Sequence, residues 1–521
     1  MKKLMGLILT TIMVLSLSMT AFAATVTVEN NVADHVFKAY GIFTGTQQEG
    51  EVALGDVAWD DDINATAFLA ELKTKSDLFD SCSTAADVAA VLETYSDDSA
   101  EAKLFAKIAY NHVDETKGVA ISNQTTVLVD GYYLIVDVTE VGANDSYNAA
   151  LLQVTGKENI TIGLKKDQPT VVKKIEENGN MMDVADYSIG DTVNFVLTSV
   201  VPDMTYYDTY KMVFHDSMSA GLAFEDDVTI KIGTGNSAVV LTENTDFTVN
   251  TSSNCQDMDN CSFEIAISNL KGVQNITAGQ TITITYSATV DSDAEIGFPG
   301  NPNAIKLEYS NNPNQSADDT EHETGFTTTD TVVVFTYKLN VAKVDGANNE
   351  TMLSGAQFVL YRMNGSTREY AVVTGGNISG WTSDEDEATV LSSGADGLFS
   401  VAGIDSGKYY LEETNAPAGY NLLDKPVEFT ITATLETGDW ETTIVDDAFT
   451  KLEITVPDDD ATTVDTTEGS TDGTVNITIE NNQGSVLPET GGIGTKIFYV
   501  VGAFLVLGAG IILFVRKRVN K

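Results

Sequence analysis

Three polar side chains occupy positions in predicted strands where apolar residues are expected. Side chains of a β-strand alternate between two faces, and in LNVAK this alternation puts Lys343 on the face that leucine and valine mark as the core face. By the same alternation Glu413 follows Leu411, and Asn481 follows Ile479. An unpaired polar or charged group in a core is expensive. The three residues therefore either form an ion pair with an asparagine nearby, lie at strand ends that reach water, or react with one another.

The reaction would be formation of an amide bond between a lysine and an asparagine. Burial lowers the pKa of a lysine and raises that of a carboxyl group. A neutral amine is a nucleophile, a protonated carboxyl group can polarise an amide oxygen, and folding holds amine and amide together. Lys343 would attack Asn481 with help from Glu413, and one ammonia would leave. Alternation alone does not decide between reaction and ion pair.

A second set of residues repeats this pattern in the middle of the chain. Lys173 alternates with apolar residues in PTVVKKI, Asp216 does so in YKMVFHD, and Asn303 does so in NAIKL. Asn301 and Asn311 lie close to Asn303 in the sequence and are alternatives to it. The same chemistry is therefore expected twice.

The elements that must position these residues belong to a chain of 521 residues, which is long enough for several domains. Residues 24–165 mix strands, such as HVFKAYGIFTG and DGYYLIVDV, with helices. Thr84 and Asp87 form a capping-box pattern at a helix start, and apolar residues at helical spacing predict a further helix around 104–109. We expect an N-terminal domain of mixed α/β structure.

Residues 166–330 and 331–485 carry many short strand patterns separated by turns rich in Gly and Asn. Examples are DTVNFVLTSV, TITITYSATV, AQFVLYR and PVEFTITATL. This pattern is typical of immunoglobulin-like β-sandwiches. The predicted fold is mainly β, with two tandem sandwiches of that kind after the N-terminal domain. Residues 456–474 lack apolar periodicity and are expected to be a solvated loop.

Both ends of the chain carry signals for export and membrane attachment. Residues 1–23 combine a basic start, an apolar run and Ala-Phe-Ala, which predicts a signal peptide. Residues 497–515 are apolar and long enough to span a bilayer, and the basic tail 516–521 would stay in the cytoplasm. A short motif precedes this span: Leu487, Pro488, Glu489, Thr490 and Gly491. Its proline excludes a helix, and an extended peptide beside the membrane suits capture by a surface transpeptidase.

Composition limits the remaining functions. The net charge is −47, so nucleic acid is not an expected partner, because phosphate binding needs basic patches. The sequence has no HExxH, GxSxG or P-loop motif, and we expect no enzyme, no cofactor and no metal. Cys255 and Cys261 could close a small disulfide loop outside the cell or remain two free thiols, and Cys82 is expected to be buried.

Several stretches resemble a known domain family. LEETNAPAGY resembles the E-box of the collagen-adhesin B-type domain of Gram-positive pilins, VAKVD and LSGAQFVLY resemble its first strands, and IENNQG resembles its last strand. The resemblance implies Lys343 as nucleophile, Asn481 as acceptor and Glu413 as catalytic acid. The adjacent Asn482 and Glu412 are out of phase with the apolar residues of their strands.

The middle of the chain is similar to the isopeptide-forming second domain of shaft pilins. The similarity lies in QPTVVKK, FHDSMSAGL and GNPNAIKLEYSNNP. It implies Lys173, Asp216 and Asn303 as a second triad.

The C-terminal motif, span and basic tail resemble the cell-wall sorting signal of Gram-positive surface proteins. This implies that a sortase cleaves between Thr490 and Gly491 and hands Thr490 to an amine, either in peptidoglycan or on a lysine of another copy. Shaft pilins use a lysine near the end of their first domain, where TIGLKKDQPTV offers Lys165, slightly preferred, and Lys166. The linking motif of the family usually has a proline before the lysine, where this chain has Leu164.

Together these resemblances predict a structural shaft, or backbone, pilin on the cell surface, anchored to peptidoglycan. The expected partners are a class C-type pilus sortase, a housekeeping sortase, other copies of the chain, peptidoglycan, minor pilins and host surface ligands. The alternative is a monomeric wall-anchored adhesin that binds host surface ligands.

Overall fold

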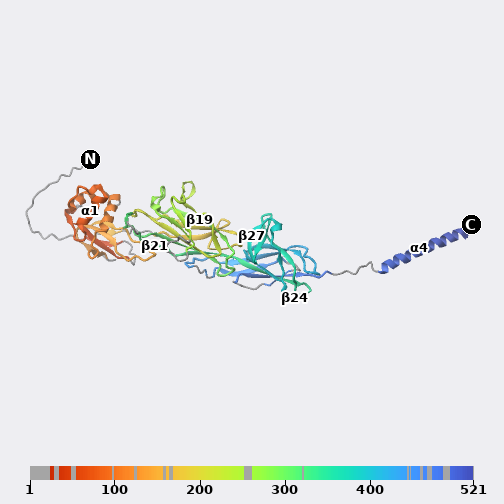
Figure 1. Cartoon of the computed structure of the whole chain (residues 1–521). Coiled ribbons are helices and arrows are strands. Elements are labelled where there is room, and N and C mark those ends of the chain that lie inside the picture. The colour runs from red at the N-terminus through yellow and green to blue at the C-terminus, as the bar shows by residue number, and fades with distance from the viewer. Residues whose placement is uncertain are drawn as a thin grey trace, which may run out of the picture. The chain divides into compact units, whose positions relative to one another are not determined.

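The structure is a computed structural model that describes most of the chain after residue 23. The described residues are 24–28, 35–47, 54–96, 99–121, 126–155, 160–162, 168–251, 261–318, 322–442, 445, 447–457, 462–465, 472–484 and 493–519. They form two compact units, Met1–Thr336 with Thr434–Thr450, and Tyr337–Ala433 with Lys451–Lys521. The described residues are mainly β, and helices other than the last one lie in the N-terminal part (Figure 1).

The N-terminal part of the first unit packs helices on a sheet. The sheet has the order β3-β2-β6-β7, with β4 paired to β2. Its strands are β2 (Phe37–Gln47), β3 (Leu54–Trp59), β4 (Val119–Ile121), β6 (Gly131–Asp137) and β7 (Leu151–Thr155). The helices are α1 (Ala65–Lys75), η1 (Asp77–Phe79), α2 (Ala85–Leu92) and α3 (Ala100–Tyr110).

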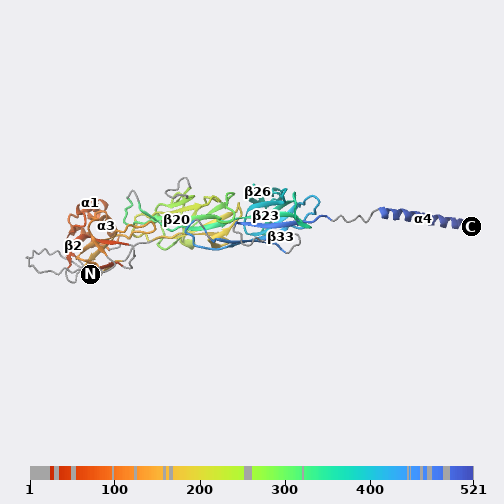
Figure 2. The ribbon, with the colours of Figure 1, turned by 90° about the horizontal axis from the view of Figure 1, so that it is seen from below.

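The core of this part joins helices to strands. Phe68 of α1 and Phe105 of α3 are fully buried in one cluster with Leu134 of β6, and Figure 2 shows α1, α3 and β2 in the same part of the chain. The predicted capping box is confirmed: Thr84 and Asp87 accept from each other's backbone N–H groups at the start of α2. A small sheet of order β5-β1-β8 adds β1 (Ala24–Val28), β5 (Thr126–Leu128) and β8 (Ile160–Ile162).

The rest of the first unit contains two seven-stranded sheets among the described residues. One has the order β10-β9-β12-β19-β15-β16, with β14 on β19, and the other β11-β22-β20-β13-β18-β17, with β21 on β20. The strands of the first are β9 (Val172–Glu177), β10 (Asn180–Met182), β12 (Thr192–Val200), β14 (Leu222–Phe224), β15 (Thr229–Ile232), β16 (Val239–Val240) and β19 (Thr281–Val290). Those of the second are β11 (Val184–Asp186), β13 (Met212–Met218), β17 (Thr248–Thr251), β18 (Phe263–Ile267), β20 (Asn301–Ser310), β21 (Thr324–Phe326) and β22 (Asp330–Phe335). Short 3₁₀ turns are η2 (Gly235–Ser237) and η3 (Leu270–Gly272).

The second unit is built on a twelve-stranded sheet. Its order is β32-β31-β30-β25-β26-β27-β29-β23-β34-β33, with β24 on β23 and β28 on β25. The strands are β23 (Tyr337–Asp345), β24 (Asn348–Met352), β25 (Gln357–Asn364), β26 (Thr367–Thr374), β27 (Asn377–Thr382), β28 (Leu391–Ser392), β29 (Leu398–Ile404), β30 (Gly407–Asn415), β31 (Val427–Leu435), β32 (Phe449–Thr455), β33 (Thr462–Asp465) and β34 (Thr474–Asn481). A 3₁₀ turn, η4, spans Glu385–Glu387.

Three details differ from the sequence expectations. Strand β22 (Asp330–Phe335) was expected to open the third domain, but it pairs with β20 in the first unit. The boundary between the two units in the sequence therefore falls between residues 336 and 337. Residues 434–450 also belong to the first unit, where Trp440 forms a β-bridge with Thr331. Within the expected loop 456–474, residues 462–465 form β33 and pair with β34, so the loop prediction was wrong for these four residues.

The C-terminal helix α4 (Ile493–Val519) contains a segment, Phe498–Arg518, that is long and apolar enough to cross a membrane. It overlaps the predicted span 497–515. Its last turn carries the basic residues Arg516, Lys517 and Arg518.

Candidate functional site

The first set of predicted site residues meets between the two seven-stranded sheets. Lys173 is the second residue of β9 in one sheet, whereas Asp216 of β13 and Asn303 of β20 belong to the other. The neighbour Val172 is 42% exposed, while Lys173, Ile175, Asp216 and Asn303 are all 0% exposed. All three polar side chains therefore point into the core, as the alternation along each strand predicted.

The lysine amine lies against both the acid and the amide. Lys173 Nζ donates to Asp216 Oδ2 at 2.7 Å and also to Asn303 Oδ1. A tyrosine completes the cluster: the Tyr286 hydroxyl donates to Asp216 Oδ2 at 2.6 Å and accepts from Asn303 Nδ2 at 3.2 Å. The nucleophile is thus already in contact with the group that it would attack.

Burial shifts both ionisable partners toward their neutral forms. Desolvation lowers the pKa of Lys173 to about 8, although the nearby Asp216 acts in the opposite direction. Desolvation likewise raises the pKa of Asp216 against the pull of Lys173. The rings of Phe195 and Tyr286 lie 5.5 and 5.6 Å from Lys173 Nζ and contribute to the apolar surroundings. The pair is therefore suited to share one proton, with the amine neutral and the carboxyl protonated.

The two alternative asparagines have other roles. Asn301 Nδ2 donates to the carbonyl groups of Glu295 at 3.2 Å and Val334 at 3.1 Å. Asn311 Nδ2 donates to the carbonyl of Asp145 at 3.3 Å, in the N-terminal part of the unit. Both asparagines thus hold backbone segments in place, whereas the Asn303 side chain contacts the lysine.

The second set of predicted residues is positioned by a parallel strand pair. Strands β23 and β34 pair in parallel, so that Lys343 lies opposite Ile479 and Asp345 opposite Asn481. Lys343 and Asn481 therefore share one face, two residues out of register. Glu413 lies in β30, and Lys343, Glu413 and Asn481 are 0%, 5% and 1% exposed.

The contacts in this second cluster join the acid to the amide directly. Asn481 Nδ2 donates to Glu413 Oε2 at 3.1 Å and to the carbonyl of Asn421 at 2.8 Å. The backbone N–H of Leu423 donates to the same Glu413 oxygen at 3.0 Å. Lys343 Nζ donates to the carbonyl of Ile479 at 2.9 Å, which places the amine beside the strand that carries Asn481.

Burial acts on the lysine of the second cluster as it does on that of the first. Desolvation lowers the pKa of Lys343 to about 8, with Glu413 acting in the opposite direction. Glu413 Oε1 and Asn481 Oδ1 are both buried and have no hydrogen-bond partner within the described residues. Both atoms are acceptors, and a proton on Glu413 would turn one of them into a donor.

The adjacent alternatives point elsewhere. The Glu412 side chain is 36% exposed and forms an ion pair with Arg368 at 2.9 Å. Asn482 is exposed, and its backbone carbonyl accepts from Asn421 N–H at 3.0 Å. The phase argument made from the sequence therefore agrees with the geometry at both positions.

Two features of the clusters were not anticipated from the sequence. Tyr286 lies in TITITYSATV, where its position indicates only a core residue, and nothing in the pattern links it to Lys173. The segment after the E-box, from Tyr420 to Leu423, supplies backbone contacts to Glu413 and Asn481. Loop contacts of this kind leave no periodic signal in a sequence.

Other predicted sites lie outside the described residues. These are the signal peptide, the motif from Leu487 to Gly491, and both candidate linking lysines, Lys165 and Lys166. Cys255 also lies outside them, whereas Cys261 is disulfide-bonded. Cys82 is a free buried cysteine, as expected.

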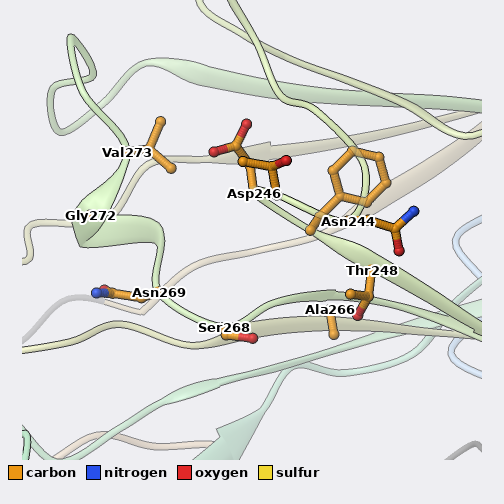
Figure 3. A pocket seen from close by; sticks show the side chains of 10 residues that line it. Asn244, Asp246, Thr248, Ala266, Ser268, Asn269, Gly272 and Val273 are labelled. Atoms are coloured by element: carbon orange, nitrogen blue, oxygen red, sulfur yellow. The ribbon is translucent and has the colours of Figure 1, made fainter.

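An open depression lies beside strands β17 and β18 (Figure 3). It has a volume of about 330 Å³ and is lined by residues 244–248, 266, 268, 269, 272 and 273. The described residues contain no group of three or more His, Cys, Asp or Glu that could hold a metal ion. The depression itself offers one carboxylate, Asp246, which accepts from the backbone N–H of Thr242 at 2.8 Å. The chemistry is therefore concentrated in the two buried clusters.

Three family models match the chain. They are a prealbumin-like fold domain over residues 337–448, a Gram-positive pilin backbone subunit 2, Cna-B-like domain over residues 189–313, and an LPXTG cell wall anchor motif over residues 479–521. The chain is also 25% identical over 424 residues to the trypsin-resistant surface T6 protein of Streptococcus pyogenes serotype M6. The aligned region covers 72% of this chain and 74% of that protein. The chain belongs to the Gram-positive backbone pilins.

One solved pilin structure shares the fold, and a second is similar in sequence. The T6 backbone pilin of serotype M6 S. pyogenes, described as a modular three-domain structure, matches with a TM-score of 0.52 at 17% identity, over 89% of this chain and 99% of that one. The backbone protein of the group B streptococcus pilus 2b is 26% identical, with a TM-score of 0.39, over 61% of this chain and 99% of that one. The anchor motif places this pilin at the cell wall and makes it a sortase substrate, as predicted.

Proposed function

We propose that this backbone pilin is joined covalently to its neighbours through Thr490 and is stabilised by two internal isopeptide bonds, Lys173–Asn303 and Lys343–Asn481. The contact of Lys173 Nζ with both Asp216 and Asn303, in a fully buried cluster, carries the proposal. An ion pair alone does not account for an asparagine amide held against the amine.

The chemistry is the same in both clusters. The neutral lysine Nζ attacks the asparagine Cγ, a new Nζ–Cγ bond forms, the Cγ–Nδ2 bond breaks, and ammonia leaves with the proton that Nζ gives up. The protonated carboxyl group of Asp216 or Glu413 stabilises the charge that develops on the amide oxygen. Each cluster reacts once, so the pilin is its own substrate and does not turn over.

The proposed bonds act on the strands that carry them. Lys173 and Asn303 are 130 residues apart and lie in different sheets of one unit. Closing a loop of that length restricts the unfolded chain and is worth about 5 kcal/mol in the loop-entropy description used for disulfides. Lys343 and Asn481 lie on the adjacent parallel strands β23 and β34. Pulling force on either part would therefore pass through a covalent bond before the sheet could unzip.

For polymerisation, we propose that a class C-type pilus sortase cleaves after Thr490 and transfers it to Lys165 or Lys166 of the next subunit. A housekeeping sortase would join the last subunit to peptidoglycan, and minor pilins and host surface ligands would be further partners. We also propose the division into domains 24–165, 166–330 and 331–485, with the last boundary moved to residues 336 and 337, where the two compact units divide. It puts the two lysines at the boundary between the first and second domains.

An immunoblot of cell-wall extract boiled in SDS tests the polymerisation. We expect a ladder of covalent multimers that collapses when Lys165 and Lys166 are both replaced by Arg. The matched control is Lys231→Arg, because Lys231 is an exposed lysine on β15, and it should leave the ladder intact. A single monomer band from the unaltered protein would favour the wall-anchored adhesin instead.

A further inference from the structure

The acid of the first cluster does not reach the amide in the same way as the acid of the second. In the second cluster Glu413 Oε2 lies 3.1 Å from Asn481 Nδ2, the nitrogen that must leave. In the first cluster, the Tyr286 hydroxyl lies between Asp216 and the corresponding nitrogen of Asn303. Aspartate is one methylene shorter than glutamate, and the hydroxyl bridges the remaining distance.

The contacts form a continuous chain from nucleophile to leaving group. Lys173 Nζ is 2.7 Å from Asp216 Oδ2, this oxygen is 2.6 Å from the Tyr286 hydroxyl, and the hydroxyl is 3.2 Å from Asn303 Nδ2. All three links are buried within hydrogen-bonding distance. A proton that leaves the amine can therefore reach the departing nitrogen without passing through water.

We propose that Tyr286 is a catalytic residue of the first cluster, whose hydroxyl relays a proton from Asp216 to the leaving nitrogen of Asn303. This inference rests on the proposed Lys173–Asn303 bond. It assigns a role that the second cluster does not require, because its acid contacts the leaving nitrogen directly.

The proton balance is complete within the four residues. Asp216 starts protonated. After Lys173 Nζ attacks Asn303 Cγ, the Tyr286 hydroxyl gives its own proton to Asn303 Nδ2 and receives the proton of Asp216. The Asp216 carboxylate left behind then takes a proton from Nζ. The Cγ–Nδ2 bond then breaks and ammonia leaves, while Asp216 and Tyr286 end in their starting protonation states.

Packing accounts for the ring of Tyr286 but not for its hydroxyl. The ring stacks on Phe195 at 5.4 Å and meets Phe263 edge-on at 5.2 Å between centroids. A phenylalanine would satisfy these contacts equally well, and a buried hydroxyl costs free energy unless it is bonded. Among the described residues, the hydroxyl has two hydrogen-bond partners, Asp216 and Asn303, and both belong to the site.

The test measures bond formation in the two clusters of one molecule. The full chain is made by cell-free translation with detergent, sampled over time and digested, and the cross-linked peptides Lys173–Asn303 and Lys343–Asn481 are quantified by mass spectrometry. We expect Tyr286→Phe to slow the first bond by about 10²-fold, the lower end of the usual contribution of a proton-transferring group. The second bond should form at an unchanged rate.

The outcomes separate this inference from the function on which it rests. If the unaltered chain yields neither peptide, the isopeptide proposal fails and the relay fails with it. If the unaltered chain yields both and Tyr286→Phe forms the first bond at the normal rate, the relay alone is overturned.

Two further variants separate proton transfer from packing. Phe263→Leu removes the edge-on ring contact with Tyr286 but retains the hydroxyl, and the relay predicts a rate within a few-fold of the unaltered chain. A slowing equal to that of Tyr286→Phe would show that packing is the cause. If Tyr286→Phe does not fold, 3-fluorotyrosine at position 286 keeps the shape with a more acidic hydroxyl. A changed rate then supports the relay, and an unchanged rate overturns it.

Discussion

At the scale of single residues, two buried lysines determine what this pilin can do. Desolvation is the largest cause of the lowered pKa of both Lys173 and Lys343, and in each case an acid and an asparagine are buried nearby. Free lysine side chains are rarely fully buried. Their burial is explained if the amine is consumed in a bond once the protein has folded.

Replacing the acid of the second cluster should prevent that bond alone. Without this acid the Asn481 amide is no longer polarised, so the second bond should not form. After correction for the substitution, Glu413→Ala should therefore be heavier than the normal product by one retained ammonia. The control is Glu412→Ala, which removes the adjacent carboxylate on the other face of β30. Intact mass spectrometry measures both variants. An unchanged ammonia loss in Glu413→Ala would show that another group is the acid.

Bond formation should also depend on pH in a direction that identifies the reactive form. Lys173 and Asp216 of the first cluster titrate as a pair, and the reactive pair holds one proton, on the carboxyl group. The Lys173 pKa of about 8 marks the loss of that last proton. The unlinked chain, refolded by dilution from denaturant, should therefore form the Lys173–Asn303 bond about tenfold more slowly per pH unit above 8. A rate that keeps rising from pH 8 to 10 would mean that the acid need not be protonated.

The sequence alone was enough to predict the site residues that alternate regularly with apolar residues along a strand. Lys343 and Glu413 could be predicted because the strands around them alternate cleanly, and the same phase argument set aside Glu412. The choice of Asn303 over Asn301 could not be made in this way, since both lie on one face of β20 and both are buried. Their roles differ in hydrogen-bond partners, which only the folded chain specifies.

At the scale of elements, strand pairing brings distant residues together. The parallel register of β23 and β34 places Lys343 near Asn481 across more than 130 residues of sequence. The sequence patterns predicted both strands but not that they pair. Parallel strands far apart in the sequence are not joined by a short turn that could be recognised in it. Strand β33 was missed for a related reason: Thr-Thr-Val-Asp is a polar edge strand held by backbone pairing to β34.

A further prediction concerns the end of strand β6 in the N-terminal part. Asp137 is buried. Its Oδ2 accepts from Asn148 Nδ2 at 2.9 Å and lies 2.6 Å from His35 Nδ1, and its Oδ1 accepts from the Thr139 hydroxyl at 2.6 Å. Burial alone would raise the pKa of Asp137, but these hydrogen bonds together lower it. The contribution of the Asp137 carboxylate to the stability of the folded state should therefore be complete above its unfolded-state pKa of about 4. It should be lost as the pH falls through the lower pKa of the folded state.

Asp137→Ala should accordingly lower the free energy of opening of β6 at pH 7 by about 3 kcal/mol, since it leaves several buried groups unpaired. Hydrogen exchange of the β6 backbone amides measures this change. Glu140→Ala removes the same charge from an exposed position and should change it by no more than about 0.5 kcal/mol. Equal effects of the two variants would show that net charge, and not the buried network, is responsible.

At the scale of the whole molecule, the proposed bonds decide how the pilin responds to force. In single-molecule pulling, the segment between residues 173 and 303 should not extend in the normal protein. Asp216→Ala should release its 130 residues, which is roughly 450 Å of additional chain length. The Glu412→Ala variant again serves as the control and should not add length. Full extension of the normal protein would contradict a covalent bond between residues 173 and 303.

The most direct test of these proposals is the intact mass of recombinant residues 24–485. The Lys173–Asn303 and Lys343–Asn481 bonds predict a mass below that of the sequence by two ammonias, in addition to the two hydrogens lost in a disulfide at Cys261. A deficit of one ammonia would limit the chemistry to one cluster, which the Asp216→Ala and Glu413→Ala variants would identify. A mass with neither ammonia lost would mean that the two buried clusters are ion pairs and hydrogen bonds only, and the covalent account would be wrong.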